Sequence, residues 1–203
     1  MLTESFKKDF PNSFPRIINF LIWLKIKPNG LTTMGVMFGL IAGFLFACGH
    51  FLLGGLAVFF GGFCDIFDGV LARHFEETTQ FGRFYDSVMD RYSELAIFIG
   101  LSFYYSHQSG MVFQQIAADL SLAGSLLVSY TKARAEGLGE VCNVGFMQRP
   151  ERIILIILGT VLTGLFKNQL FATIALVIIA FSSNITALQR IFYIRKKLSP
   201  PKK

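Results

Sequence analysis

The sequence predicts an all-α integral membrane protein of six transmembrane helices, preceded by an amphipathic helix in the membrane interface. Three observations predict it: 53% of the 203 residues are hydrophobic, only 16% are charged, and the mean hydropathy is +0.53. A chain this apolar and charge-poor is typical of membrane proteins, not of soluble domains. A bilayer core of about 30 Å takes roughly 20 residues per helix, so this length accommodates about six spans.

The first half of the chain begins with an amphipathic segment. From Phe14 to Ile26, apolar side chains recur at helical spacing while most basic residues fall elsewhere, which is typical of a helix lying in the membrane interface. From Leu31 to Cys64 there is no charged residue, and the break Cys48-Gly49-His50 divides this run into a helical hairpin. Its second helix is expected to continue past Cys64 through the acidic residues that follow.

Four further helices follow from the same pattern of apolar runs and polar breaks. The expected ranges are about Gly82 to Tyr104, Met111 to Glu136, Arg149 to Phe166, and Gln169 to Ile194. We divide the chain into residues 1–28 (cytoplasmic N-terminus with the amphipathic helix), 29–196 (six-helix membrane domain) and 197–203 (basic cytoplasmic tail).

The basic residues predict the orientation. On the six-helix layout every Lys and Arg except Lys167 lies toward one face, and cytoplasmic loops are the ones enriched in these residues. We therefore expect a multi-pass membrane protein with both termini and the three charged junctions between helices in the cytoplasm. The net charge of +6 faces lipid headgroups on this layout, so no nucleic-acid partner is expected. The three cysteines are scattered singly and indicate neither a disulfide framework nor a zinc site.

Four aspartates cluster where the second and third predicted membrane helices meet. Asp65 and Asp68 are three residues apart and Asp86 and Asp90 four apart, so each pair shares one helix face. Such acids repel one another in a low dielectric unless cations neutralise them, and oxygen ligands select hard ions such as Mg²⁺ or Mn²⁺. Gly69, Gly82 and Ala72 leave that face open for a bulky anionic ligand. The alternative is a cation or proton transporter, or ion pairs with nearby arginines.

The stretch from Asp65 to Asp90 reads D-x2-D-G-x2-A-R-x8-G-x3-D-x3-D. It resembles the signature of the CDP-alcohol phosphotransferase family, and every fixed position matches. The resemblance implies transfer of a phosphatidyl group from CDP-diacylglycerol, or a CDP-linked ether lipid, to an alcohol, with release of CMP. The family also implies two metal ions and a homodimer.

The same resemblance implies roles for individual residues. Metal ligands would be Asp65, Asp68, Asp86 and Asp90, with Asp90 also the general base that takes the proton of the attacking hydroxyl. The nucleotide and diphosphate would lie against Gly69, Ala72, Arg73 and Gly82, and against Asn29 and Thr32 of a Pro-Asn-Gly-Leu-Thr segment. That segment is equally well explained as an interfacial loop and helix cap.

Several cations beside this motif suit an acceptor that itself bears a phosphate. The segments around Ser129 and Arg152 resemble the branch of the family that makes phosphatidylinositol phosphate, or its archaeal ether-lipid counterpart, from inositol phosphate. The residues matching the acceptor phosphate site of that branch are Ser129, Lys132, Arg152 and Arg190. Glycerol 3-phosphate or another alcohol remains the alternative acceptor.

Two further features of the spacing each allow more than one interpretation. Glu94 extends the face of Asp86 and Asp90 by another four residues, and could anchor Arg91, anchor a neighbouring helix, or support the metal ligands from behind. Gly35, Gly39 and Gly43 repeat every four residues and predict a close helix contact, within this chain or across a dimer.

Overall fold

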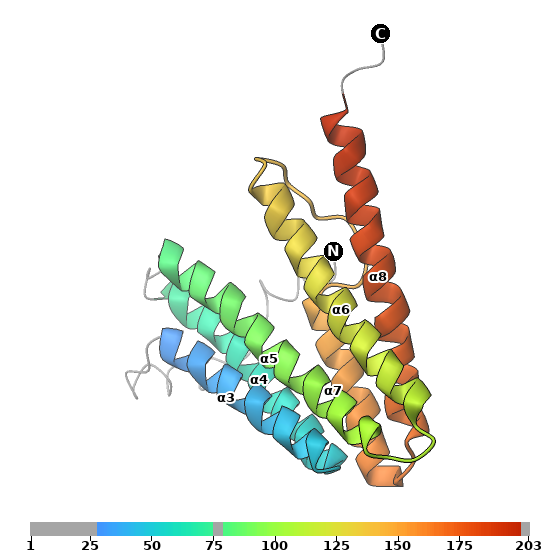
Figure 1. Ribbon diagram of the computed structural model, residues 1–203. Coiled ribbons are helices and arrows are strands. Elements are labelled where there is room, and N and C mark those ends of the chain that lie inside the picture. Colours follow the sequence, from blue (N-terminus) through green and yellow to red (C-terminus); the bar gives the residue numbers. More distant parts are fainter. Residues whose placement is uncertain (1–27, 75–78, 200–203) are drawn as a thin grey trace.

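The computed structural model describes residues 28–74 and 79–199, and every ordered element in them is a helix (Figure 1). The amphipathic helix predicted from Phe14 to Ile26 lies outside the described residues. The six described helices are α3 (Pro28–Ala47), α4 (Phe51–His74), α5 (Gln80–Ser106), α6 (Val112–Glu136), α7 (Arg149–Phe166) and α8 (Leu170–Leu198).

The helices agree with the expected ranges except at a few ends. Helix α5 begins at Gln80, not at Gly82, because the Thr79 side chain caps it by accepting a hydrogen bond from the Gly82 backbone N–H at 2.9 Å. Helix α8 runs four residues past Ile194, to Leu198. Its last turn contains three basic residues, which form helices readily and complement the negative end of the helix dipole.

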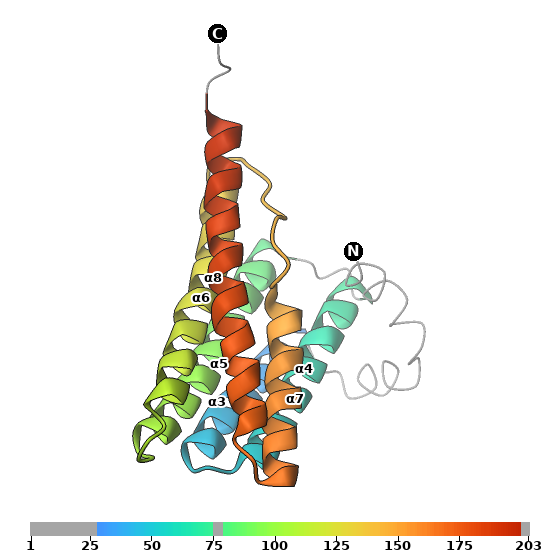
Figure 2. The same ribbon diagram turned by 90° about the vertical axis from the view of Figure 1, so that its right-hand side faces the viewer.

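The helices form two groups of three that lie against each other. Helix α3 contacts both α4 and α5, and α8 contacts both α6 and α7; α4 packs on α7 and α5 on α6 to join the groups. The short connections α3–α4, α5–α6 and α7–α8 lie together at one end of the molecule (Figures 1 and 2). The beginnings of α3, α5 and α7 therefore share the opposite end with the last turns of α4, α6 and α8.

A seam of small residues brings α3 and α5 into backbone contact. A methyl group added at Gly43 would lie 2.3 Å from the Ala96 carbonyl oxygen, and one at Gly100 would lie 2.0 Å from the Gly43 carbonyl oxygen. Only glycine permits that approach. The glycine repeat therefore makes a helix contact within the chain, one of the two possibilities predicted from its spacing.

The outer surface of the helices is strongly apolar. Four of the described helices contain segments long and apolar enough to cross a membrane, namely Pro28–Ala47, Phe51–Leu71, Val112–Glu136 and Leu170–Leu198. Large side chains such as Phe44 and Phe181 face outward, about 70% exposed. Since such a surface suits lipid and not water, the chain is an all-helical membrane protein.

Inside, an apolar core fills the half of the bundle nearer the short turns. Phe46, Phe98, Ile156 and Ile179 are fully buried in it, one each from α3, α5, α7 and α8. The charged side chains of α5 and α7 lie in their N-terminal halves, beyond this core. The core thus fixes the helices that present the charged groups.

Candidate metal and substrate site

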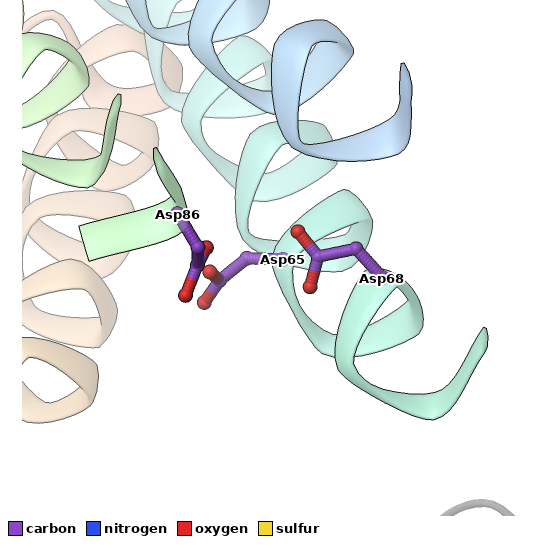
Figure 3. A group of neighbouring side chains, drawn as sticks. All are labelled: Asp65, Asp68 and Asp86. Carbon is purple, nitrogen blue, oxygen red and sulfur yellow. The ribbon is translucent and has the colours of Figure 1, made fainter. Parts of the chain in front are cut away.

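Three carboxylates from two helices converge beyond the apolar core. Each of Asp65 and Asp68 on α4 and Asp86 on α5 offers a carboxylate oxygen, and these oxygens lie within 4.8 Å of one another. Figure 3 shows the three side chains pointing toward one another from their helices. The spacing of three residues on α4 sets two carboxylates on the face that meets α5, as predicted from the sequence.

Asp68 is held by a residue of a third helix. The Thr32 hydroxyl on α3 donates to the Asp68 carboxylate at 2.7 Å, and both side chains are buried. A hydroxyl that bonds a carboxylate oxygen restricts its rotation and orients the other oxygen. Thr32, expected at the nucleotide, therefore lies directly against the carboxylate cluster.

Asp90, expected as a fourth ligand, is bound by one arginine and lies near a second. Arg149, the first residue of α7, brings Nη2 within 2.7 Å of an Asp90 oxygen and Nη1 within 2.8 Å of an Asp65 oxygen. Arg91 lies 3.8 Å from the other Asp90 oxygen. One guanidinium therefore bridges α4 and α5, and it connects Asp90 to the carboxylate cluster through Asp65.

A second arginine on α7 makes a fully buried pair one turn further on. Arg152 donates from Nε to one oxygen of Glu94 at 2.7 Å and from Nη2 to the other at 3.2 Å. Its Nη1 donates to the Met147 carbonyl at 3.3 Å. Arg152 is 1% exposed and Glu94 2%, so this pair is closed to solvent. Of the possibilities for Glu94, the structure shows that it anchors a neighbouring helix, α7, through Arg152.

The other residues expected to bind the acceptor phosphate lie on α6 and α8. Arg190 on α8 is buried and donates to the carbonyls of Val128 and Val144, and Ser129 follows Val128 on α6. Lys132, one turn further, is 3.9 Å from Glu136 and partly exposed. Arg152 and Arg190 each bind a carbonyl of the segment joining α6 to α7, which brings the two arginines to the same connection.

The residues expected at the nucleotide lie at the same end of the bundle. A methyl group added at Gly69 would meet none of the described residues within 4 Å, so these residues leave that face of α4 open. One added at Gly82 would lie 3.6 Å from the Asn29 side-chain oxygen, which places the starts of α3 and α5 next to each other. Ala72 and Arg73 belong to the last turns of α4, but their side chains lie outside the described set.

The cluster fits a hard divalent cation. Its donors are carboxylate oxygens only, and they come from two helices and lie close enough together to form a group that could hold a metal ion. Oxygen-only sets of this kind suit Mg²⁺ and Mn²⁺, whereas softer metals select nitrogen and sulfur. Cys64 is the nearby sulfur in sequence, and it belongs to a separate apolar cluster with Leu31 and Phe67.

Arg149 is the site residue that sequence reasoning did not single out. The sequence assigned a role to Arg152 on the same helix, yet it gave Arg149 neither a role nor a partner. Its position at the start of a helix, one turn before Arg152, puts both side chains on one face. Which carboxylates that face meets depends on how α7 packs against α4 and α5.

Comparisons with known proteins agree on one family. The model of the CDP-alcohol phosphatidyltransferase family matches residues 25–184. The archaetidylinositol phosphate synthase of Methanothermobacter thermautotrophicus is 36% identical over 166 residues, covering 78% of this chain and 82% of the relative.

Two crystal structures of the phosphatidylinositol phosphate synthase of Mycobacterium tuberculosis have the same fold, each with a TM-score of 0.82. The structure with CDP-DAG bound is 28% identical and covers 92% of this chain and 97% of its own. The complex with manganese and citrate is 30% identical and covers 91% of this chain and 89% of its own.

Proposed function

The chain belongs to the CDP-alcohol phosphatidyltransferase family, and we propose that it transfers a phosphatidyl group from a CDP-linked lipid to inositol phosphate. It is an enzyme, a membrane transferase of phospholipid synthesis, so the transporter alternative is not retained. The observation that supports the reaction best is the convergence of Asp65, Asp68 and Asp86 at the open face of α4 beside Gly69. Diphosphate chemistry needs clustered negative ligands of this kind.

The proposed chemistry is an in-line displacement at phosphorus. The acceptor hydroxyl oxygen bonds to the phosphorus of the phosphatidyl group, the bond from that phosphorus to the bridging oxygen breaks, and CMP leaves with that oxygen. Asp90 takes the hydroxyl proton. Two divalent cations, Mg²⁺ or Mn²⁺, held by Asp65, Asp68, Asp86 and Asp90 would supply charge neutralisation at the diphosphate.

The acceptor assignment rests on the cationic residues near the connection between α6 and α7. We propose that Ser129, Lys132, Arg152 and Arg190 receive the phosphate of inositol phosphate. Lys132 is 44% exposed and its ion pair with Glu136 is long, at 3.9 Å, so its ammonium group is accessible. Arg152 uses three of its five N–H groups on Glu94 and Met147, which leaves donors for a further oxygen.

The remaining parts of the proposal concern the membrane. We propose six spans, with α5 and α7 crossing alongside the four strongly apolar helices because both pack within the same bundle. Both termini and the active site would face the cytoplasm of a plasma membrane, where the positive-inside rule puts the basic residues. The homodimer implied by the family stays a prediction, which light scattering of the detergent-solubilised protein would check.

The deciding experiment measures CMP release by the purified protein with Mg²⁺ and CDP-diacylglycerol. Inositol 1-phosphate, glycerol 3-phosphate, free inositol and serine are compared side by side. We expect release with inositol 1-phosphate alone. Release driven by another acceptor keeps the reaction class and overturns the acceptor, whereas no release with any of them overturns the donor as well.

One variant pair tests the acceptor pocket directly. Lys132→Gln should raise the KM for inositol 1-phosphate about tenfold or more, since a charge-assisted phosphate contact is lost, and should leave the KM for CDP-diacylglycerol unchanged. Arg195→Gln makes the same change of charge in the exposed last turn of α8 and should alter neither KM. Equal behaviour of the two variants would remove Lys132 from the pocket.

A further inference from the structure

Arg149 forms ion pairs with two of the proposed catalytic carboxylates at once. Its two terminal nitrogens each bind a different aspartate, Asp65 on α4 and Asp90 on α5, at 2.8 and 2.7 Å. Asp65 is at the same time one of the three carboxylates that converge on one point. The guanidinium therefore holds one group of the cation-binding cluster and the group proposed as the general base.

The way in which Arg149 is held suits exchange. Its Nε is buried but has no hydrogen-bond partner among the described residues, so only the tip of the side chain is bound. Arg152, one turn further, is bound through Nε and both terminal nitrogens. Its carboxylate partner is nearly closed to solvent, whereas Asp65 is one-third exposed. The Arg149–Asp65 pair is thus bound through fewer nitrogens of the arginine and is the more accessible of the two.

A guanidinium and a divalent metal ion cannot both bind the same carboxylates at full strength. A carboxylate oxygen that accepts a short charge-assisted hydrogen bond is a poorer metal ligand, and a guanidinium repels a divalent ion beside it. On the proposed function, Asp65 and Asp90 both serve the divalent cations. Arg149 and those cations therefore compete for the two aspartates.

We propose that Arg149 is a built-in counter-cation that holds Asp65 and Asp90 until divalent cations displace it. This inference rests on the proposed function, because it takes Asp65 and Asp90 as metal ligands. Displacement frees the Asp90 carboxylate, so metal loading and release of the base are one event. Arg149 is in this sense a positioning residue: it acts through the two aspartates.

The test measures Mn²⁺ binding to the full-length protein in detergent, without lipid or acceptor, from the loss of the free-ion signal in electron paramagnetic resonance. Arg149→Gln should bind Mn²⁺ at least tenfold more tightly than the wild type, because the competitor is removed. Arg149→Lys, which keeps the charge but cannot bridge two carboxylates through one planar group, should fall between them.

The matched control is Arg91→Gln, which removes the other arginine near Asp90. Its contact with Asp90 is 3.8 Å long, so its loss changes the local charge by the same amount without freeing a bound carboxylate. We expect less than a threefold gain in affinity. An equal gain from Arg91→Gln would overturn the inference, because it would reduce the effect to charge alone.

Further outcomes are equally decisive. An Arg149→Gln affinity equal to or below that of the wild type would make Arg149 a structural tie or a metal-site support, and would overturn the inference. If that variant does not fold, the wild type is compared with Arg149→Lys alone, where an unchanged affinity has the same meaning. Absence of Mn²⁺ binding to the wild type would instead overturn the proposed metal site itself, and this inference with it.

Discussion

Two arginines three residues apart on α7 face carboxylates of the same neighbouring helix, yet their surroundings differ sharply. Arg152 and Glu94 form a closed pair, each at most 2% exposed, in which both oxygens and three donor nitrogens are used. Arg149 binds two different aspartates, one through each terminal nitrogen, at the accessible end of the helices. Breaking a closed pair leaves a buried charge alone, whereas an accessible pair can be exchanged for another cation. We infer that the Glu94 contact maintains the fold and holds Arg152 in place, whereas the contacts of Arg149 are open to exchange during the reaction.

The largest expected effect comes from the partner of Arg149. Asp90→Asn should reduce CMP release by about 10²- to 10⁴-fold, the usual contribution of a general base, while CDP-lipid binding and thermal stability stay close to those of the wild type. The matched control is Asp119→Asn on α6, whose carboxylate accepts a hydrogen bond from Ser102 at 2.6 Å, away from the cluster. Near-normal turnover by Asp90→Asn would remove Asp90 from the base role.

The partner of Arg152 should show the opposite pattern. Glu94→Gln leaves the Arg152 guanidinium buried without a counter-charge, so the free energy of unfolding should fall by about 3–5 kcal/mol. Unfolding in detergent, followed by circular dichroism, measures it. If Glu94→Gln were as stable as the wild type and lost only activity, the two pairs would not differ in the way inferred above.

A neutral donor on the cluster offers an intermediate case. Thr32→Val keeps the shape of the side chain but removes the hydroxyl that holds Asp68, so Mn²⁺ affinity should fall by about tenfold. Thr33→Val is the control, because that hydroxyl bonds the Asn29 carbonyl at 2.8 Å and no carboxylate. Equal Mn²⁺ affinities in the two variants would show that Thr32 does not tune the cluster.

The smallest effect is expected for an ion pair at the surface. Glu140 and Lys197 form an ion pair between the connection after α6 and the last turn of α8, at the surface. Exposed pairs of this kind contribute little, since water and salt screen them. Glu140→Gln should therefore leave the unfolding midpoint and CMP release unchanged, which makes it the matched control for Glu94→Gln. A large loss of stability would contradict the ranking by burial.

The spacing of residues along the sequence predicted the individual helices and their faces better than it predicted the contacts between helices. Apolar runs and polar breaks located all six described helices, because a membrane helix needs a continuous apolar segment. The separations within Asp65–Asp68 and Asp86–Asp90 predicted shared faces, and three of the four carboxylates converge. The Thr79 cap at the start of α5 was missed, since the residues around it have no apolar pattern.

Which acid each arginine pairs with could not be predicted from the sequence, for a physical reason. Arg149 and Arg152 meet partners on helices more than 50 residues away, and helical spacing says nothing about which helix lies alongside. Glu94 could have served Arg91 or a neighbouring helix equally well, and the packing of α7 on α4 and α6 on α5 decided between them. The roles assigned to Ser129, Lys132, Arg152 and Arg190 stay predictions from the resemblance.

The backbone contact between α3 and α5 at Gly43 and Gly100 has a mechanical consequence. Where no side chains separate two helices, neither can slide along the other without collision of main-chain atoms, so the pair behaves as a single stiff beam. Thr32 stands on one member of that beam, and Asp86 and Asp90 on the other. Motion during a catalytic cycle is then left to side chains and to the helices outside this pair, with the beam as the fixed frame of reference.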